Sequence, residues 1–399
     1  MYAFFVDFSK AFDMVVHENL WYKLLKNGLT GRMFNIIHSM YNRLKTCVMV
    51  NGEIYDVFYC QLGVRQGECL SPFLFAMYIN DLEKSIESPE SGVTILHVKL
   101  LILLYADDVV IFANSSSNLQ NSINRLYEYC NRWKLKINTS KSFILVFSRG
   151  RFYTFDTWKY GNDVISVATH IKYLGLIFTS NGSSYQAQLT LSKQANKAVF
   201  QLQKKICNYK TMSISVVIDL FDKFIDPILN YGCESWGFHG APDIERIQIR
   251  FYKRILGVKS STQNDFIYGI LGRVPMLIHR QCRIIKYWTN IILGKKSTYV
   301  SLLHSSSLIN IDKRYKNNWA FDVRKLLCSN GFGDVWRDQF VTNQDRFCLA
   351  FKNRLKDVFK QEWSCRISES TRASFYREII GIHSFQIFSI FQFPAIELL

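Results

Sequence analysis

The chain has 399 residues, of which 49 are Lys or Arg and 32 are Asp or Glu, so its formal net charge is +17. A hydrophobic content of 48% excludes a disordered or collagen-like chain, and the length suffices for two or three domains with cores of their own. The charge is uneven, because residues 1–113 contain 9 basic and 12 acidic side chains. We therefore expect a polyanionic partner to bind mainly through the residues after 113.

The sequence lacks the features of membrane and secreted proteins. Its most apolar run, residues 93–106, contains His97 and Lys99 and is too short to span a bilayer. Residues 1–8 show neither a basic leader nor a small-residue cleavage site. The ten cysteines are widely spaced, which predicts reduced, mostly buried thiols and no zinc or disulfide framework. We expect an intracellular protein of the cytoplasm and/or nucleus without a membrane partner.

The first part of the chain alternates between strand and helix patterns. Residues 2–6 form a β-prone apolar run, and no earlier segment is there to pair with it. Apolar residues then recur at helical spacing over 18–42, with a break at Asn27-Gly28. The further elements expected are a hairpin over 46–59 that turns at Asn51-Gly52, a helix from Pro72 to about Ile86, a strand, turn and strand over 98–113, and a helix over 118–135.

The second part becomes helical and basic. Strand patterns return over 143–147 and 164–178, and Asn181-Gly182 closes them. Helical patterns follow over 184–209, 216–236, 244–256 and 275–293. Six basic side chains occur between residues 273 and 296 without an acidic one, whereas the apolar tail over 384–399 fits no pattern.

Three aspartates stand where apolar strands end. Asp7 follows the first strand, and Asp107-Asp108 lie between two apolar runs at the tip of a tight hairpin. Adjacent carboxylates in such surroundings are costly unless a cation compensates them. Two Mg²⁺ ions held by carboxylates are the usual arrangement for nucleotidyl transfer. Taken alone, an Asp-Asp pair in a hairpin is more often only a turn.

Five segments, in order along the chain, resemble the motifs of a reverse transcriptase palm. Their sequences are similar to those of reverse transcriptases from non-long-terminal-repeat (LINE-like) retrotransposons. The segments are 5–13 (FVDFSKAFD), 63–72 (GVRQGECLSP), 105–108 (YADD), 136–142 (KINTSKS) and 173–175 (YLG). Residues 228–236 (ILNYGCESW) look like the region after the palm, so a weaker resemblance extends to about residue 380.

The resemblance implies an α+β fold. A right-hand polymerase palm with a ferredoxin-like split β-α-β core would occupy residues 1–180. A helical thumb over 181–300 would grip the template–primer backbone by phosphate contacts, before a basic helical C-terminal region of unassigned role over 301–399. The fingers, endonuclease domain and zinc knuckle of the family have no counterpart here, so we expect a truncated fragment that polymerises poorly by itself.

The resemblance also assigns a metal site. Asp7, Asp107 and Asp108 would hold two Mg²⁺ ions, or Mn²⁺ as a substitute, together with the backbone carbonyl of Phe8. Lys141 matches the lysine that gives a proton to the leaving pyrophosphate. A solvated surface lysine is the alternative for this position.

Further residues are implied to bind the nucleotide. The backbone amides of Ser9, Lys10 and Ala11 would cradle phosphate oxygens. Phe12 would exclude a ribose 2′-hydroxyl and so favour dNTPs, although a core phenylalanine is equally expected at this position.

A second loop is implied to contact the nucleotide and the template. Arg65, Gln66 and Gly67 would lie there, Gly67 because a backbone without a side chain can approach closely. Read in isolation, this glycine only allows the chain to turn within a loop. Tyr173, Leu174 and Gly175 (173–175) would form a primer grip at a hairpin tip.

The implied function is that of an RNA-directed DNA polymerase. It would transfer dNTPs onto the 3′-hydroxyl of a DNA primer paired with an RNA template. Two alternatives stay open: an inactive retrotransposon remnant that only binds nucleic acid, and an RNA-directed RNA polymerase, against which Phe12 and Tyr105-Ala106 argue.

Overall fold

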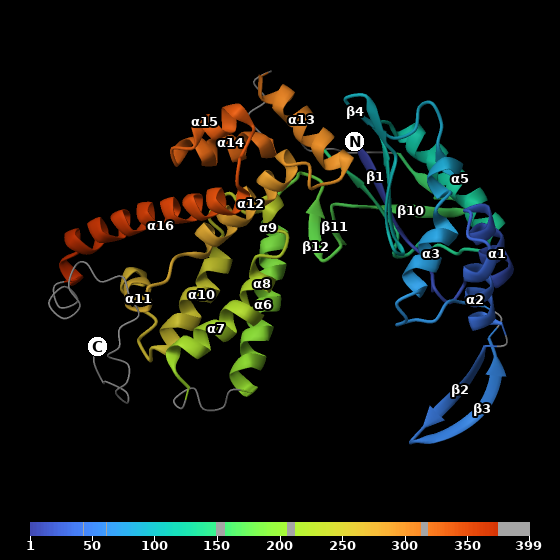
Figure 1. Ribbon diagram of the computed structural model, residues 1–399, viewed down its shortest axis with the longest axis horizontal. Helices are drawn as coiled ribbons and strands as arrows, with labels where there is room; N and C mark the ends of the chain where they lie inside the picture. The colour runs from blue at the N-terminus through green and yellow to red at the C-terminus, as the bar shows by residue number, and fades with distance from the viewer. Residues whose placement is uncertain (43, 61, 149–155, 206–211, 313–317, 374–399) are drawn as a thin grey trace. The chain divides into compact units, whose positions relative to one another are not determined.

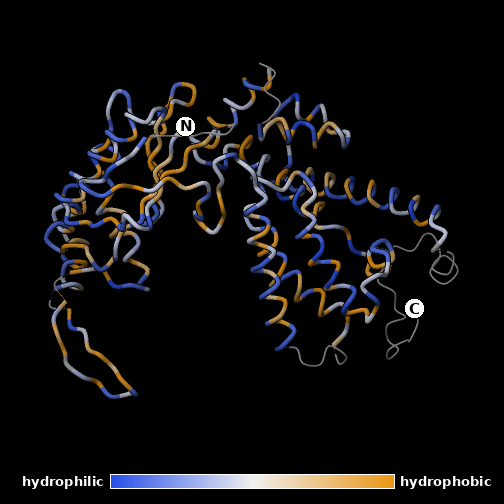
Figure 2. The backbone as a smooth tube through the Cα atoms, turned by 180° about the vertical axis from the view of Figure 1, so that it is seen from behind, coloured by the Kyte–Doolittle hydropathy of each residue, from blue (hydrophilic) through white to orange (hydrophobic). Residues whose placement is uncertain are grey.

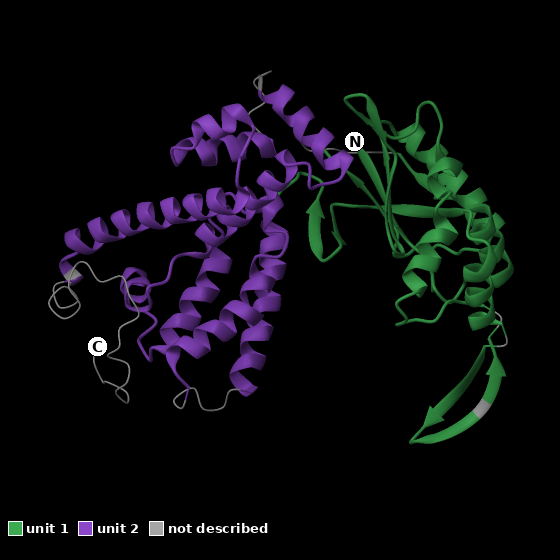
Figure 3. Ribbon diagram, viewed as in Figure 1, with its two compact units in different colours: residues 1–183 green, residues 184–399 purple. Residues whose placement is uncertain are grey.

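The protein is described here by a computed structural model that covers residues 1–373 except 43, 61, 149–155, 206–211 and 313–317. The chain divides into two compact units, residues 1–183 and 184–399 (Figure 3). The first unit mixes strands and helices, and the described part of the second is helical. The expected α+β composition, with a mainly helical second part, is present.

A six-stranded sheet forms the centre of the first unit, in the order β6-β7-β1-β8-β10-β9 (Figure 1). The sequence offers no partner before β1, yet this strand lies between β7 and β8 and pairs antiparallel with both. Both of its partners therefore come from much later in the chain. The strands are β1 (Tyr2–Asp7), β6 (Ile102–Tyr105), β7 (Asp108–Ala113), β8 (Phe143–Val146), β9 (Trp158–Tyr160) and β10 (Asp163–Ala168).

The two faces of this sheet differ, because successive side chains of a strand point to opposite sides. Phe4 and Val6 of β1 lie in the core with Ile111 of β7, under helix α5 (Ser116–Trp133). Phe5 and Asp7 alternate with them and so lie on the opposite face. One face of the sheet is thus the core, and the other carries the first of the predicted metal ligands.

The helices of the first unit follow the predicted segments with one difference. They are α1 (His17–Lys26), α2 (Gly31–Tyr41), α3 (Ser71–Ile79), α4 (Leu82–Ile86) and α5. The expected break after α1 is present, and Gly28 there has a left-handed φ of 85°. The single helix expected up to Ile86 is divided into α3 and α4 near Asp81, whose side chain turns to Lys23 and Tyr129.

Three two-stranded hairpins complete the first unit. They are β2 (Lys45–Val50) with β3 (Glu53–Tyr59), β4 (Val93–Ile95) with β5 (Val98–Leu100), and β11 (His170–Tyr173) with β12 (Leu176–Thr179). The first turns at Asn51-Gly52 as predicted, with left-handed φ of 52° and 89°. Its strands carry exposed apolar residues such as Met49 and Ile54, and hydrophobic stretches of the ribbon are orange in Figure 2. This ribbon therefore relies on its turn and cross-strand pairs, and little on the core.

A buried ion pair joins the helices of the first unit. Lys23 of α1 is 1% exposed, and its ammonium contacts the carboxylate of Asp81. It also donates to Tyr129 Oη (3.1 Å) and lies 3.6 Å from the centre of the Trp133 ring, both on α5. Burial lowers the pKa of Lys23, although Asp81 opposes the shift.

The second unit contains the helices after residue 184. They are α6 (Tyr185–Lys205), α7 (Ile214–Phe224), α8 (Asp226–Leu229), α9 (Cys233–Trp236), α10 (Pro242–Ile255), α11 (Asn264–Leu271), α12 (Met276–Ile292), α13 (Thr298–Asp312), α14 (Trp319–Ser329), α15 (Gly333–Asp338) and α16 (Gln344–Glu369), with a 3₁₀ turn at Thr371–Ala373.

The prediction of one long helix over residues 216–236 in the second unit is wrong. Residues 216–236 are divided among α7, α8 and α9, since Pro227 lies in the first turn of α8 and Gly232 takes a left-handed φ of 61° before α9. The end of the helix expected over 184–209 and the tail over 384–399 lie outside the described residues.

Ion pairs fix α12 within the second unit. Three of the six basic residues between 273 and 296, expected to bind phosphates, are held by carboxylates of other helices. The pairs are Arg273 with Asp222 (2.5 Å), Arg280 with Glu245 (2.7 Å) and Arg283 with Asp226. For these arginines the expectation is corrected: they serve helix packing, and Arg280 is fully buried.

Two smaller expectations concern membranes and cysteines. Of the helices that the structure describes, none has both the length and the apolarity to cross a membrane. The nine cysteines within the described residues are free thiols. Only Cys130 and Cys233 among them are buried, so the expectation of mostly buried thiols is wrong.

Replacing Lys23 with Met should lower the free energy of unfolding by about 3 kcal/mol, because Asp81 then loses its buried partner. Urea denaturation measures the change. Lys26→Met, at an exposed site of the same helix, is the control and should cost less than about 0.5 kcal/mol. Equal losses in the two variants would contradict this role of the ion pair.

Candidate active site

The pairing of β1 with β7 brings Asp7 directly opposite Asp108. Directly opposed residues of antiparallel strands lie on the same face, with Cβ atoms about 4.5–5.5 Å apart. Asp107 precedes Asp108 in the two-residue turn between β6 and β7, because Tyr105 pairs with Asp108. The three predicted metal ligands are thus gathered at one end of the sheet.

The main chain of Asp7 is bound on the side away from Asp108. Its amide donates to Ser142 Oγ (3.0 Å), and its carbonyl accepts from the amide of Asn138 (2.8 Å). The two aspartates therefore form a pair without main-chain hydrogen bonds between them, the kind in which side chains approach most closely. Because carbonyls alternate in direction along a strand, that of Phe8 points to the β7 side.

Negative charge is concentrated at this end of the sheet. Partial desolvation of its carboxylate raises the pKa of Asp108, and the negative charges of Asp107 and Asp7 raise it further. Asp107 and Asp108 are exposed, and Asp7 is half-buried. The turn holds Ala106 at a left-handed φ of 52°, which costs about 1 kcal/mol for a residue with a side chain. The fold thus keeps these acidic groups together against an electrostatic and a conformational cost.

These groups do not enclose a metal ion by themselves. Within the described segments, no three His, Cys, Asp or Glu side chains form a complete metal site. Mg²⁺ needs no such cage, because it binds one or two carboxylates and takes further oxygen ligands from water and substrate phosphates. The carboxylates of Asp7 and Asp108 and the Phe8 carbonyl are an all-oxygen donor set of this kind. The mutual repulsion that raises the pKa of Asp108 also favours a cation there.

The expected phosphate cradle in the turn after β1 is only partly present. The Ser9 amide donates to the carbonyl of Lys136 (2.8 Å), so it is not available to a phosphate. Lys10 has a left-handed φ of 50°, and its carbonyl accepts from the amide of Asp13 (2.9 Å). The expected cradle of three amides is therefore reduced to those of Lys10 and Ala11.

A short ladder joins the segments of Phe12 and Gln66. The Val64 amide donates to the Phe12 carbonyl (2.8 Å), and Gln66 Nε2 donates to Asp13 Oδ1 (2.9 Å). Gly63, which precedes Val64, has a left-handed φ of 91°, and a Cβ there would lie 3.1 Å from the Asp13 backbone. Two predicted nucleotide-binding segments are thus side by side, and Asp13 is a contact that the sequence reasoning missed.

The predicted nucleotide contacts differ in what surrounds them. Phe12 is half-buried, with its ring centre 5.1 Å from that of Phe75, so it packs on the core without being enclosed. Gly67 has a left-handed φ of 86°, and no atom lies within 4 Å of the place of a Cβ. The guanidinium of Arg65 is bound by Glu68 of the same loop (2.6 Å) and by the main-chain carbonyl of Met40 in α2 (3.2 Å).

Lys141 lies in the turn that holds the main chain of Asp7. Its side chain is exposed, and its amide donates to the Asn138 carbonyl (3.1 Å). The next residue, Ser142, is 0% exposed, and its hydroxyl both accepts from Asp7 and donates to Asn138 (2.9 Å). The sequence reasoning missed Ser142 and Asn138. Polar residues that lead directly into an apolar strand are the signal that points to them.

The predicted primer grip also lies close to Asp108. Tyr173 contacts Phe5 edge to face, with ring centres 5.4 Å apart. Burial raises the pKa of Tyr173, and the charge of Asp108 adds to the shift. Leu174 and Gly175 form the turn of the β11–β12 hairpin, both with left-handed φ (45° and 84°). Tyr173 therefore packs on the face of the sheet that carries Asp7 and Asp108.

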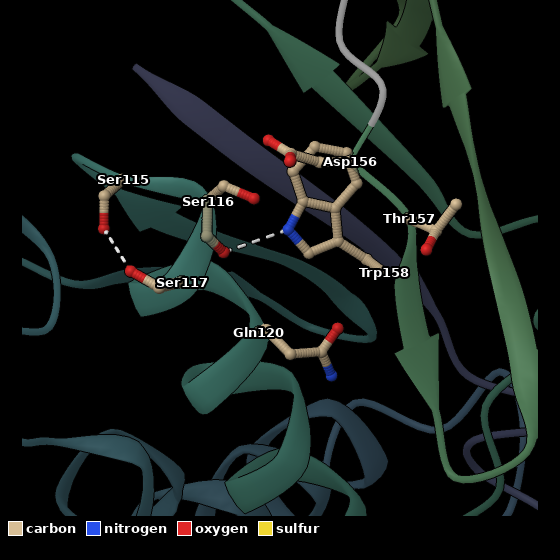
Figure 4. Close-up of a pocket in the computed structure, with 7 residues that line it drawn as sticks. All are labelled: Ser115, Ser116, Ser117, Gln120, Asp156, Thr157 and Trp158. Carbon is tan, nitrogen blue, oxygen red and sulfur yellow. Dashed lines mark hydrogen bonds between the residues drawn. The ribbon is translucent and has the colours of Figure 1, made fainter.

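A pocket at the start of α5 is separate from these residues. It is lined by residues between 115 and 120 and by residues 156–158 (Figure 4). Ser115 caps the helix with its side chain, and Trp158 Nε1 donates to a carbonyl of the same helix start (3.1 Å). Because α5 begins beyond the end of β7 that is distant from Asp108, this pocket belongs to the other end of the sheet.

Residues 1–178 match the family model described as reverse transcriptase (RNA-dependent DNA polymerase). The resemblance inferred from the five motifs is thereby confirmed.

Relatives in mobile elements are similar over larger parts of the chain. A probable RNA-directed DNA polymerase from transposon X-element of Drosophila melanogaster is 26% identical over 62% of this chain and 27% of the relative. A retrovirus-related Pol polyprotein from type-1 retrotransposable element R2 of Popillia japonica is 24% identical over 90% of this chain and 59% of the relative. An RNA-directed DNA polymerase from mobile element jockey of Drosophila funebris is 23% identical over 61% of this chain and 27% of the relative. The chain thus spans less than two thirds of the length of each.

Ser142→Ala should lower the free energy of unfolding by about 1–3 kcal/mol, because the buried amide of Asp7 loses its acceptor. Urea denaturation measures the loss. Ser140→Ala is the matched control, since Ser140 is exposed and its hydroxyl bonds only the Asn138 side chain (2.7 Å). A Ser142 variant that is as stable as the control would contradict the role of the Ser142 hydroxyl in holding the main chain of Asp7.

Asp108→Asn should stabilise the protein at neutral pH. The folded-state pKa of Asp108 is raised, so the folded state binds the proton more tightly and loses stability as pH rises through this range. The advantage of the Asn variant should be present at pH 7, shrink as pH falls through the raised folded-state pKa of Asp108, and vanish below about 4, the unfolded pKa. Urea denaturation over a pH series measures it, with Asp163→Asn as an exposed control. A pH-independent difference would contradict the prediction.

Proposed function

We propose that this chain, whose residues 1–178 belong to the reverse transcriptase family, is the catalytic part of an RNA-directed DNA polymerase. The observation that carries the proposal is the direct opposition of Asp7 and Asp108 at an accessible end of the sheet, with Asp107 in the adjoining turn. The substrates are an RNA template, a DNA primer and dNTPs. A nucleotide is added to the primer 3′-hydroxyl with release of pyrophosphate.

In this proposal the first unit is the polymerase palm, and the helices over 184–300 are the thumb. The division of the chain at residues 183 and 184 is compatible with this assignment. Helix α6 supports a role in contacting a phosphate backbone, because it contains four lysines and no acidic residue.

Asp7, Asp107 and Asp108 are the side chains that would hold Mg²⁺ or Mn²⁺, with the Phe8 carbonyl as a further oxygen ligand. When bound, two such ions lower the pKa of the primer hydroxyl and offset the charge of the triphosphate. The chain itself keeps the ligands in place, because Ser142 fixes the main chain of Asp7.

The residues beside the aspartates would select and orient the nucleotide. The half-buried ring of Phe12 stands against a ribose 2′-hydroxyl, which favours dNTPs over NTPs. Gln66, held by Asp13, and the open backbone at Gly67 would lie against the base pair being formed. The exposed Lys141 would give a proton to the leaving pyrophosphate.

The proposal is tested by primer extension with the purified chain, using dNTPs, Mn²⁺ or Mg²⁺ and an RNA template annealed to a DNA primer. Asp108→Asn and Asp107→Asn should each reduce the rate by about 100-fold or more, since each removes a ligand of the metal. Asp163→Asn, an exposed acid of the same unit, should leave it unchanged.

Two results would contradict the proposal. Equal residual signals in the wild type and both site variants would leave the inactive nucleic-acid-binding remnant as the better account. Preferential incorporation of NTPs would favour an RNA-directed RNA polymerase. Mn²⁺ binding, followed by electron paramagnetic resonance, tests the ligands separately, and Asp108→Asn should weaken it even where extension is slow.

A further inference from the structure

Helix α16 carries a row of lysines on one face. Lys352, Lys356 and Lys360 follow one another at intervals of four residues. Residues at this spacing are neighbours on a helix surface, with a rise of about 6 Å per step. Lys352 and Lys360 are exposed, and Lys356 is half-buried. The helix therefore presents a line of ammonium groups along its axis.

Helix α16 is anchored at several points, so this row has a fixed place in the second unit. The buried Phe351 packs with residues of α12 in a common hydrophobic core, and the two helices lie side by side (Figure 1). Near the start of α16, Gln344 Nε2 donates to Asn290 Oδ1 of α12 (2.7 Å). Near its end, Trp363 Nε1 donates to the carbonyl of Asp265 in α11 (2.8 Å).

The row lies along the contact between α16 and α12. Burial raises the pKa of Cys282 on α12 to about 11, against the positive charges of Lys352 and Lys356. Burial also raises the pKa of Cys348 on α16, and Lys286 of α12 is among the groups that oppose the shift. Lysines of both helices therefore face the same seam. We refer to Lys286, Lys352 and Lys356 as the seam lysines.

The seam lysines have no acidic partner within the described residues, since none of them takes part in an ion pair there. The charges near Lys356 are largely positive: burial lowers its pKa, and Lys352 and Lys360 lower it further. Like charges at this spacing destabilise a helix. The arginines of α12 and its start each have a carboxylate, whereas the seam lysines leave their positive charge open to an anionic ligand.

We propose that the seam lysines bind the phosphate backbone of a nucleic acid. The inference rests on the proposed function, which makes nucleic acid the polyanion that this chain handles. A rise of about 6 Å between lysines corresponds to roughly two phosphate steps of about 3.4 Å, so the row matches alternate phosphates of one strand. Such contacts position the nucleic acid and read no base sequence. The region after residue 300 thereby gains a role in holding template or primer.

A phospholipid surface is a poorer match for this row. Helices that lie on a bilayer insert an exposed apolar face between the headgroups. The apolar face of α16 is already buried inside the unit, through Phe351 and Leu355. A row of lysines that binds through charge alone favours a nucleic acid, because its phosphates are regularly spaced along the strand.

The test compares two charge-matched double variants of the full chain. Lys352→Gln/Lys356→Gln removes two seam lysines, and Arg324→Gln/Lys325→Gln removes two exposed cations of α14. Binding to a fluorescein-labelled RNA–DNA hybrid is measured by anisotropy over a series of KCl concentrations. The slope of log K against log salt should become less negative by about 2 in the seam variant, since each lost phosphate contact contributes about 0.9. The α14 variant should keep the wild-type slope.

A third variant and a second ligand complete the test. Lys352→Arg/Lys356→Arg should retain the wild-type slope, and equal thermal unfolding of all variants verifies folding. A seam variant whose slope equals that of the α14 variant would overturn the inference while leaving the polymerase proposal standing. Loss of binding to phosphatidylserine vesicles, with hybrid binding intact, would overturn it in favour of a membrane surface. A wild-type chain that binds no hybrid would remove both proposals.

Discussion

The antiparallel pairing of β1 with β7 is the constraint on which the candidate active site depends. It sets Asp7 against Asp108 in a pair whose side chains approach closely, because the main chain of Asp7 is bound on the other side. The same strand direction turns the Phe8 carbonyl towards β7. A shift of one residue in this register would send Asp7 into the core, so the chemistry depends on the same ladder as the packing.

The two faces of the sheet divide stability from function. Phe4 and Val6 bury one side of β1 under α5, while Phe5 and Asp7 occupy the other side near Tyr173. The end of the sheet at this second face carries groups that the fold itself does not need: the carboxylates that repel one another and the left-handed turn at Ala106. Buried packing on the first face offsets these costs, which is how strained and charged groups persist at functional sites.

Positive charge in the second unit has two different uses. The arginines at and before α12 are bound by carboxylates, and a planar guanidinium is well suited to such fixed pairs. The seam lysines Lys286, Lys352 and Lys356 have no such partner among the described residues. Net charge alone does not distinguish these cases, because it counts a buried, paired Arg280 and an exposed Lys352 equally.

Local signals in the sequence were sufficient for features that depend on neighbouring residues. Asn51-Gly52 predicts its hairpin and Gly28 its helix break, because each requires only a left-handed backbone. The five motifs, by their order, predict the resemblance that the reverse transcriptase family model matches over residues 1–178. Tertiary structure decided which distant groups meet: Asp7 with Asp108, Ser142 with the Asp7 amide, and Ser9 with Lys136, which removes one expected phosphate ligand. The physical reason is that hydrogen-bond partners across a sheet depend on strand order and register, and no local pattern of residues encodes either.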